Sequence, residues 1–361
     1  MKRTITALAV LFVCGNVFAN DDYGMKPGKV ELKSASVLAF GPNDVLFVGD
    51  TKAATVYAIS TGDTKGDAAS AKFENKKIQS NLNDMFGGST RIKDIVANPK
   101  TGNLFLACET EGKPSIVYVT EGGRQMKQLP LSESKFSKVA LKDAPEDKAT
   151  GRRRRNPRDS SITDLAFFEG KLLVSGLKAS GSPSSVREID FPFIADDRGI
   201  GVQIYHGAHG RDEDYAAMST FVTIIIYGES SLLAAYVCTP LVKIPLKKLE
   251  MDGKKVKGTT VAELGNRNQP LDMIAYKKDG ADHLLLSNSA RGVMKITTQG
   301  LAGNEGLSTR VKSGDTAGQK YETIKELQGV RQMTKLNETH AVVLIQKDRA
   351  TPAVLKTVAL P

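Results

Sequence analysis

Apolar residues recur along the chain in short runs that are joined in pairs by a polar turn. In residues 36–50, the run Val37–Phe40 passes through Gly41, Pro42, Asn43 and Asp44 into a second apolar run. Apolar runs of about four to eight residues, bounded by Gly, Pro, Asn and Asp, are typical of β-hairpins. The same pattern predicts further hairpins in residues 94–108, 164–176, 220–238 and 272–288, and more loosely in 332–346.

The hairpins are evenly spaced. The intervals between their first residues are 58, 70, 56, 52 and 60, counted from Ser36, Asp94, Asp164, Thr220, Asp272 and Gln332. A period of this length, with several strands in each unit, is typical of a β-propeller. We therefore predict an all-β chain with six antiparallel, four-stranded blades. A seventh blade, assembled from the chain ends, is the alternative.

Two long intervals, those of 58 and 70 residues, contain insertions. Residues 78–86 have the pattern of a short amphipathic helix, and residues 143–160 form a polar, arginine-rich loop. We expect residues 29–34 to add a strand to the last blade, because an open ring would leave strand edges unpaired. No long linker interrupts residues 20–361, which we interpret as one domain.

The N-terminus has the pattern of a secretory signal. Lys2 and Arg3 precede an apolar stretch, and residues 17–19 fit the small-residue rule for cleavage before Asn20. Lipidation at Cys14 is a weaker alternative. No later stretch is apolar enough for a membrane span. The sequence therefore predicts a periplasmic or secreted protein without a membrane span, in which removal of residues 1–19 lowers the net charge from +10 to +8.

The strand–turn–strand units, together with strand endings such as residues 55–59 and 115–120, resemble the superfamily of YVTN-like and quinoprotein amine dehydrogenase β-chain-like propellers. The resemblance covers nearly the whole mature chain and implies the fold rather than an activity. The chain contains no Trp and no Cys-x-x-Cys-His motif. A tryptophan-derived quinone and covalently attached haem are therefore excluded.

Strand direction sorts the loops of a four-stranded blade onto two faces. The loop before the first strand and the turn between the second and third strands share one face. Nearly every unusual polar motif belongs to this set, whereas the opposite turns, such as residues 99–102, have only turn chemistry. We therefore expect one binding site on the loop-rich face.

The sharpest motif is His206-Gly-Ala-His209 within residues 205–214. Two imidazoles in a glycine-flanked loop suit a divalent metal, with Asp212 or Glu213 adding oxygen and Cys238 as a third ligand. The alternative is a hydrogen-bonded histidine pair that shapes the loop.

Three aspartates occupy equivalent positions at the start of the innermost strands: Asp94, Asp164 and Asp272. Their carboxylates would either bind a hard cation or cap neighbouring backbone amides, and capping is the commoner use.

Two further loops bring polar and basic side chains to the same face, joined by lysines from second-to-third turns. The planar guanidinium of Arg suits binding of carboxylates or phosphates, which indicates an anionic ligand. Alternatively, these side chains brace neighbouring loops by hydrogen bonds. The predicted ligand-binding residues are Arg267, Arg291, Asn266, Asn268, Asn288, Lys243 and Lys52.

A run of arginines and two cysteines remain. The run could contact an anionic surface or partner, although a solvated loop is the commoner outcome, and no aromatic residues accompany it for nucleic-acid binding. Cys108 and Cys238 lie in blades that are not adjacent by this count, which favours two separate thiols. The run consists of Arg152, Arg153, Arg154 and Arg155.

Two functions remain open from the sequence. The first is an exported propeller that binds a small anionic or polyhydroxylated ligand, or a protein partner, on its loop-rich face. The second is a metal-dependent hydrolase or oxidoreductase with a metal at His206 and His209 at the mouth of the channel. The residues alone do not decide whether the protein is an enzyme.

Overall fold

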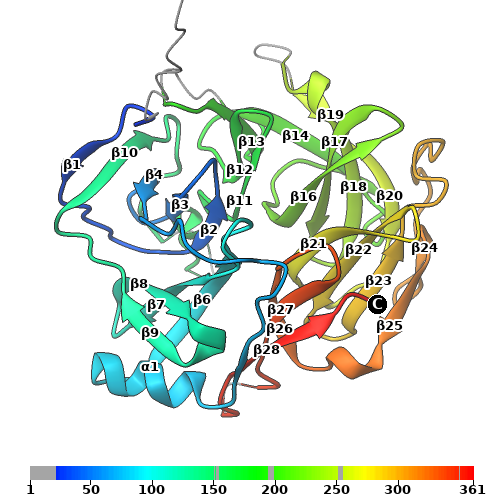
Figure 1. The fold of residues 1–361 in the computed structure, drawn as a ribbon. Helices are drawn as coiled ribbons and strands as arrows, with labels where there is room; N and C mark the ends of the chain where they lie inside the picture. The colour runs from blue at the N-terminus through cyan, green and yellow to red at the C-terminus, as the bar shows by residue number, and fades with distance from the viewer. Residues whose placement is uncertain (1–21, 150, 152–153, 194–198, 251–254, 349) are drawn as a thin grey trace, which may run out of the picture.

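The computed structural model describes residues 22–149, 151, 154–193, 199–250, 255–348 and 350–361. Six antiparallel sheets radiate from a central channel, and the predicted propeller with six blades is confirmed (Figure 1). The predicted signal segment and Arg152 and Arg153 lie outside the described residues.

Blades are numbered here by the sequence order of their innermost strands. Blade 1 contains β2 (Val37–Phe40), β3 (Val45–Asp50), β4 (Thr55–Ser60), β10 (Ser134–Ala140) and β1 (Lys26–Gly28). Blade 2 contains β6 (Thr90–Ala97), β7 (Leu104–Thr110), β8 (Lys113–Thr120) and β9 (Gln125–Gln128). Blade 3 contains β11 (Asp164–Phe168), β12 (Lys171–Leu177), β13 (Ser184–Asp190), β14 (Ile200–His206) and β15 (Arg211–Glu213), with β19 (Val256–Lys257) beside β14.

The other three blades follow the same plan. Blade 4 contains β16 (Met218–Ile226), β17 (Glu229–Tyr236), β18 (Pro240–Pro245), β20 (Thr259–Glu263) and β24 (Ala317–Gly318). Blade 5 contains β21 (Pro270–Lys278), β22 (Ala281–Asn288), β23 (Gly292–Thr297) and β25 (Tyr321–Ile324). Blade 6 contains β26 (Val330–Lys335), β27 (His340–Ile345), β28 (Val354–Ala359) and β5 (Glu74–Asn75).

The blades do not follow sequence order around the ring. The innermost strand of blade 2 contacts those of blades 1 and 6, whereas blade 1 contacts blades 2 and 3. The order around the channel is therefore 2, 1, 3, 4, 5, 6, with blade 2 closing the ring against blade 6 (Figure 1).

The segment after β4 explains this order. It crosses the turns that follow β6 and β26, where Asn98 Nδ2 donates to the carbonyl of Asp63 and Asn337 Nδ2 donates to that of Ala68. The chain then adds β5 to the outer edge of β28 in blade 6 and builds blade 2. It returns to blade 1 only with β10, which pairs with β4.

The strand that completes blade 6 is therefore not the one expected from sequence. Residues 29–34 form no strand, and β1 just before them pairs with β10 in blade 1. The pairing of Leu355 with Asn75 supplies the missing edge instead. Every blade edge needs a partner, but a polar two-residue strand such as β5 has no hydrophobic pattern that would reveal it.

Helix α1 (Ile78–Phe86) has the bounds expected from its amphipathic pattern. Ile78 and Leu82 are fully buried one turn apart, in a core cluster with side chains of blades 2 and 6. Gly87 ends the helix in the left-handed conformation with φ of 67°, which glycine adopts without a Cβ penalty. Four short 3₁₀ turns complete the described elements: Glu121–Gly123, Pro157–Ser160, Leu246–Lys248 and Lys325–Leu327.

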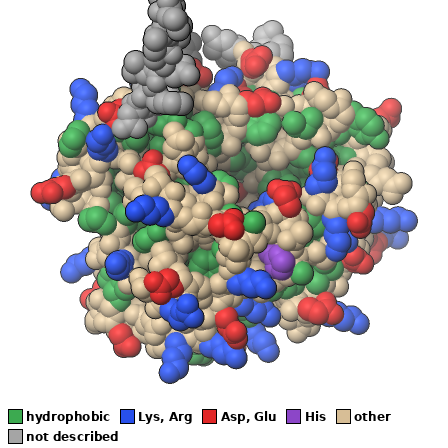
Figure 2. All heavy atoms as spheres, viewed as in Figure 1, with side chains coloured by type: hydrophobic (Ala, Val, Ile, Leu, Met, Phe, Trp, Pro, Cys, Tyr) green, Lys and Arg blue, Asp and Glu red, His purple; other side chains and the backbone are tan. Residues whose placement is uncertain are grey.

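Between the blades, apolar side chains of facing sheets form separate clusters. Phe47 of β3 is fully buried, and its ring centroid lies 4.9 Å from that of Phe191 and 5.7 Å from that of Phe167. Burial of such aromatic side chains ties blade 1 to blade 3. On the face visible in Figure 2, basic and acidic side chains are interspersed, so neither sign of charge dominates it.

Candidate functional site

The strand-start face is the face on which the innermost strands begin and the second and third strands join. Four innermost strands carry a β-bulge there. In β6 the register shifts between Ile92 and Asp94, which leaves Lys93 as an extra residue. A bulge bends the strand and redirects the side chain of the extra residue. Equivalent shifts leave extra residues at Ser219 in β16, Leu271 in β21 and Arg331 in β26.

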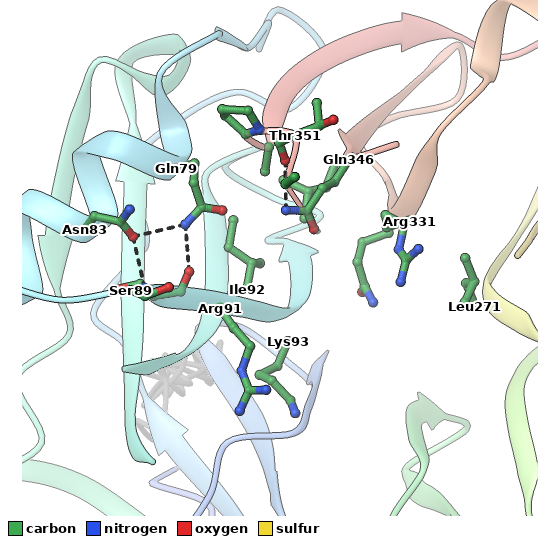
Figure 3. Close-up of a pocket in the computed structure, with 16 residues that line it drawn as sticks. Gln79, Asn83, Ser89, Arg91, Ile92, Lys93, Leu271, Arg331, Gln346 and Thr351 are labelled. Atoms are coloured by element: carbon green, nitrogen blue, oxygen red, sulfur yellow. Dashed lines mark hydrogen bonds between the residues drawn. The ribbon is translucent and has the colours of Figure 1, made fainter. Parts of the chain in front are cut away.

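A hollow of about 660 Å³ lies beside three of these bulges, those at Lys93, Leu271 and Arg331, between blades 2, 5 and 6. In Figure 3, Arg91 and Lys93 extend together from β6, and Arg331 lies across from them on β26. Gln79 Nε2 on the helix donates to Asn83 Oδ1 at 3.1 Å and to the carbonyl of Thr90 at 2.7 Å, which holds the polar wall in place.

A smaller hollow of about 360 Å³ shares Leu271, Arg331 and Gln346 with the first and adds Arg291 and Lys347. The charged residues that line the two hollows are Arg and Lys. Asp and Glu are absent from the lining residues that the structure describes. Arg91 is paired with Glu109 outside the lining. Lys93 and Arg331, in contrast, form no salt bridge with a described carboxylate, although the charge of Lys93 contributes to lowering the pKa of Glu109.

The three repeat-equivalent aspartates line the channel as half-buried side chains on alternate blades of the ring. Each carboxylate bridges to the innermost strand of the next blade. Asp164 Oδ2, for example, accepts the backbone N–H of Phe221 and the hydroxyl of Thr220, both at 2.8 Å. The other two accept backbone N–H groups in the same way, Asp94 from Leu38 and Asp272 from Met333.

Burial raises the pKa of all three carboxyls. It raises the pKa of Asp94 to about 8 and that of Asp164 to about 6. Hydrogen bonds from backbone N–H groups lower both pKa values, but by less than burial raises them. The pKa of Asp272 is raised well above its ordinary value by burial and by repulsion from Asp94. Both oxygens of Asp94 accept backbone N–H groups, Oδ2 from Leu38 and Oδ1 from Ile95, which is capping of backbone amides.

The two histidines of the His-x-x-His motif flank a tight turn in blade 3. His206 ends β14, and β15 returns beside it from Arg211. The turn closes through hydrogen bonds from the backbone N–H groups of His209 and Gly210 to the carbonyl of His206, at 3.1 and 2.8 Å. Because β14 is the fourth strand from the channel, the motif lies between blades 3 and 4 and not at the channel mouth, where the sequence analysis expected it.

Glu213 holds both imidazoles. Its Oε2 lies 2.8 Å from His206 Nδ1, and its Oε1 lies 2.7 Å from His209 Nδ1 and 2.9 Å from Arg211 Nε. The carboxylate is buried, which by itself would raise its pKa. Hydrogen bonds from Arg211, His206, His209 and Tyr215 outweigh burial and lower the pKa of Glu213 to about 2. An ionised carboxylate only accepts hydrogen bonds, so each Nδ1 carries the proton.

The second ring nitrogen of His206, Nε2, carries a lone pair. Burial lowers the pKa of His206, so the ring is neutral, and its Nε2 is buried without a hydrogen-bond partner. The centroids of the His206 and His209 rings are 3.9 Å apart, with 33° between the ring planes. Both Nδ1 atoms lie against the same carboxylate, that of Glu213.

Cys238 approaches from the β17–β18 turn of blade 4. Cys238 and Thr239 both have left-handed backbone, with φ of 64° and 55°. Hydrogen bonds from Cys238 N to the carbonyl of Asn268 and from Thr239 Oγ1 to that of Gly265 hold the turn, at 3.0 and 2.6 Å. Among the described residues, the potential ligand atoms of His206, His209 and Cys238 form a group of three that all lie within 4.8 Å of one another.

Two acidic residues near the motif have other roles. Asp212 pairs with Lys257 at 2.7 Å, on the opposite side of the strand from Glu213. Glu263, at the end of β20, supports the turn from blade 4, because its Oε2 accepts the backbone N–H of Ala208 at 3.1 Å. Burial raises the pKa of Glu263 to about 7, although the backbone donors lower it.

The predicted asparagines brace loops. Asn288 Nδ2 donates to Asn268 Oδ1 at 3.1 Å, and Asn268 Nδ2 donates to the carbonyl of Gly265, also at 3.1 Å. Asn266 Nδ2 donates to Ser313 Oγ at 2.8 Å. These bonds connect the loop before β21, which accepts the Cys238 N–H, to Asn288 in the wall of the smaller hollow.

The predicted basic residues are only partly brought together. Arg291 lines the smaller hollow, whereas Arg267 is exposed in the loop before β21. Lys243 Nζ donates to the carbonyls of Leu301 and Ala302 at 2.9 and 3.2 Å. Lys52 lies in the β3–β4 turn of blade 1, across the ring from blade 5.

Other sequence candidates lie apart from these sites. Cys108 and Cys238 are free thiols in blades 2 and 4, which stand on opposite sides of the ring. Cys108 is buried, and burial raises its pKa to about 12. Of the arginine run, Arg154 and Arg155 are described and exposed.

Comparisons with known proteins assign no family to the chain. No family model and no curated protein matches the chain. Among solved structures, the chain is similar to the Cps50 (Swd1) β-propeller domain of Myceliophteria thermophila, with 10% identity, a TM-score of 0.38 and coverage of 91% of this chain and 84% of that one. Similar values hold for the PQQ-bound aldose sugar dehydrogenase of Streptomyces coelicolor (10% identity, TM-score 0.30, coverage 93% and 97%) and for the C-terminal WD40 domain of Sif2 (8% identity, TM-score 0.35, coverage 93% and 98%).

The chain is thus a six-bladed member of the β-propeller class, as its own strand topology shows. In the part of the chain that the structure describes, no helix is long and apolar enough to cross a membrane.

Proposed function

We propose that this propeller binds a small anionic ligand, bearing carboxylate or phosphate groups, in the hollow on its strand-start face. One observation carries the proposal: bulges at equivalent positions in β6 and β26 place Lys93 and Arg331 on two sides of a hollow without acidic residues among its described lining. Two cations without a salt-bridge partner on one concave surface attract an anion, and an Arg fork can bind its oxygens in pairs.

The same wall suits hydroxyl groups on the ligand. Gln79, Asn83 and Gln346 line the hollow, and amide side chains both donate and accept hydrogen bonds. Leu271 and Ile92 add apolar surface between the charges. A sugar acid or a phosphorylated polyol therefore fits this lining better than a fully apolar compound, and an acidic segment of a partner protein would use the same cations.

Export belongs to the same proposal, because the N-terminal pattern of Lys2, Arg3 and an apolar stretch is that of a cleaved leader. Expression of the full chain in a Gram-negative host tests it. We expect periplasmic or secreted protein whose N-terminal residue is Asn20. Full-length chain confined to the cytoplasmic fraction would contradict it.

A metal-dependent hydrolase or oxidoreductase is the second candidate, favoured by the approach of His206, His209 and Cys238. This group lies between blades 3 and 4, whereas the larger hollow lies between blades 2, 5 and 6. Anion binding in the hollow therefore does not need a metal, and removal of metal by a chelator separates the two candidates.

Calorimetric titration of the mature protein with citrate, gluconate 6-phosphate and inorganic phosphate tests anion binding. We expect saturable binding of at least one probe at low salt. Arg331→Gln and Lys93→Gln should each weaken it roughly tenfold, as expected for loss of a charge-assisted hydrogen bond. Lys100→Gln removes the same charge from the opposite face, in the turn after β6, and should leave binding unchanged. Equal loss in all three variants, or no binding of any probe, would contradict the proposal.

A further inference from the structure

We propose that His206, His209 and Cys238 bind one borderline divalent transition-metal ion, for which Zn²⁺ is the best match, with Glu213 as the residue that orients both imidazoles. The three side chains come from two neighbouring blades and place their potential ligand atoms within 4.8 Å of one another. This site is separate from the hollow proposed for anions.

The donor atoms select the class of ion. Two imidazole nitrogens and one thiolate suit zinc and other borderline ions, whereas Ca²⁺ and Mg²⁺ prefer oxygen ligands. Glu213, the nearest carboxylate, is already engaged by both Nδ1 atoms and by Arg211 Nε. It therefore has the role of the carboxylate in a carboxylate–histidine–zinc arrangement rather than that of a ligand.

The spacing requires only a small contraction. With Zn–N of about 2.0 Å and Zn–S of about 2.3 Å, tetrahedral geometry separates donor atoms by roughly 3.3–3.7 Å. The ligand atoms of the three side chains lie within 4.8 Å of one another, so a movement of about 1 Å would complete the geometry. Cys238 sits at the tip of a two-strand turn and His209 is 43% exposed, so both side chains have room for this movement.

The histidines are prepared as ligands. Glu213 keeps the proton of each ring on Nδ1, which leaves Nε2 as the atom with the lone pair. Nε2 of His206 is buried without a hydrogen-bond partner, and the whole His206 side chain is only 5% exposed. An orphaned buried polar atom is costly, and a metal ion would supply the missing partner.

The ligand set leaves one coordination position of the ion unfilled by the protein. Three protein ligands leave a fourth position, and the partial exposure of His209 and Cys238 opens that position toward solvent. Water in the fourth position is the arrangement of catalytic rather than purely structural zinc sites.

Metal loading of the intact mature protein tests the site. After removal of bound metal with a chelator and dialysis against Zn²⁺, we expect one zinc per chain by elemental analysis, and Zn²⁺ should raise Tm by roughly 3–5 °C. Replacement by Co²⁺ should give a thiolate-to-cobalt charge-transfer band and the visible spectrum of a four-coordinate ion. Ca²⁺ at the same concentration should change neither Tm nor the spectrum.

Variants assign the ligands. Cys238→Ser should abolish the charge-transfer band, and His209→Ala should weaken Zn²⁺ binding by about a hundredfold or more. Cys108→Ala and His340→Ala change the same residue types elsewhere and should bind like the parent protein. His209 is partly exposed, so its variant is expected to fold, which circular dichroism checks.

Glu213→Gln separates positioning from ligation. It should weaken Zn²⁺ binding about 10–100-fold while keeping the charge-transfer band, because the ligands remain but lose their orienting carboxylate. If this variant does not fold, the result for His209→Ala decides alone. Less than stoichiometric zinc in folded parent protein, or equal affinity in parent, Cys238→Ser and His209→Ala, would overturn the proposal in favour of a histidine pair that only shapes the turn.

Discussion

Asp94 Oδ2 on β6 accepts the backbone N–H of Leu38 on β2 at 2.7 Å, and this bond joins the innermost strands of blades 2 and 1. Asp164 and Asp272 make the same kind of bond to the next blade along the ring. The six blades are therefore tied in three pairs around the channel. Since the pKa values of these carboxyls are raised, they couple the stability of the ring to pH.

We expect the protein to be more stable at pH 5 than at pH 8. The pKa of Asp94 in the folded protein, about 8, lies above its ordinary value of 3.8, so the folded state binds the proton more tightly. Its contribution is present below about pH 4 and is lost as the pH rises to about 8. Urea unfolding across this range should show a decline of more than about 1 kcal/mol.

Asp94→Asn should flatten part of this decline, because the amide cannot ionise. Asp84→Asn, on the exposed side of helix α1, serves as the control and should follow the parent profile. A profile for Asp94→Asn that is parallel to that of the parent would show that another group controls the pH dependence.

Asn75→Ala should destabilise the ring at the strand that completes blade 6. Asn75 Nδ2 donates to the carbonyl of Gly123 at 2.7 Å, and its Oδ1 accepts the backbone N–H of Lys77. Loss of these buried bonds should lower the free energy of unfolding by about 1–3 kcal/mol. Glu74→Ala, at an exposed position of the same strand, should change it by less than about 0.5 kcal/mol. Equal effects of the two variants would argue against the role of Asn75.

Gly207→Ala should displace the turn that carries the histidines. An added Cβ would lie 3.0 Å from Glu263 Oε2 and 3.1 Å from Val311 Cγ2, closer than ordinary contact. We expect a loss of about 1–3 kcal/mol in unfolding free energy, measured by urea titration. Gly303→Ala is the matched control, because a Cβ there meets no atom within 4 Å. The prediction is refuted if both substitutions are tolerated equally.

Iodoacetamide should label one of the two cysteines in residues 22–361 under native conditions. Cys108 is buried and its pKa is raised to about 12, so almost no thiolate forms. Cys238 is only partly buried and should react. Peptide mass spectrometry should find the label on Cys238 in native protein and on both residues in urea. Zn²⁺ should slow labelling of Cys238, and native labelling of Cys108 would show that blade 2 opens locally.

Binding of anions in the hollow should weaken steeply as salt is added. The charges of Lys93 and Arg331 face solvent, and the screening length falls from about 30 Å at 0.01 M to about 3 Å at 1 M salt. Calorimetric titration of the best-binding probe at several NaCl concentrations measures this. Affinity that does not change with salt would point to recognition by the amide and apolar wall instead.

Several features of the fold and the site follow from local sequence. The hairpins starting near Ser36 and Asp94 show the strand–turn–strand pattern clearly enough to predict the repeat period and the number of blades. Helix α1 follows from the amphipathic pattern of residues 78–86. The His206–His209 spacing, flanked by glycines, indicated a tight loop, and the structure places Cys238 beside it. These inferences depend on neighbours in the chain, whose chemistry the sequence displays directly.

Other features depend on contacts between distant segments. No local pattern shows that β5 pairs with blade 6 or that β10 returns to blade 1, because an outer strand is chosen by the edge that is free. The bulges that redirect Lys93 and Arg331 arise from register between paired strands, so a hairpin pattern alone conceals them.

The sequence by itself therefore determined the repeating unit, the number of blades and the residue types available for binding. The tertiary structure decided the order of the blades and, with it, which of those residues meet. Strand formation depends on local alternation of apolar and polar residues, whereas blade order depends on which unpaired edges and apolar faces find one another. That is why Glu213 could be proposed as an oxygen ligand from sequence, but only the folded ring shows it in contact with both histidines, with Cys238 nearby.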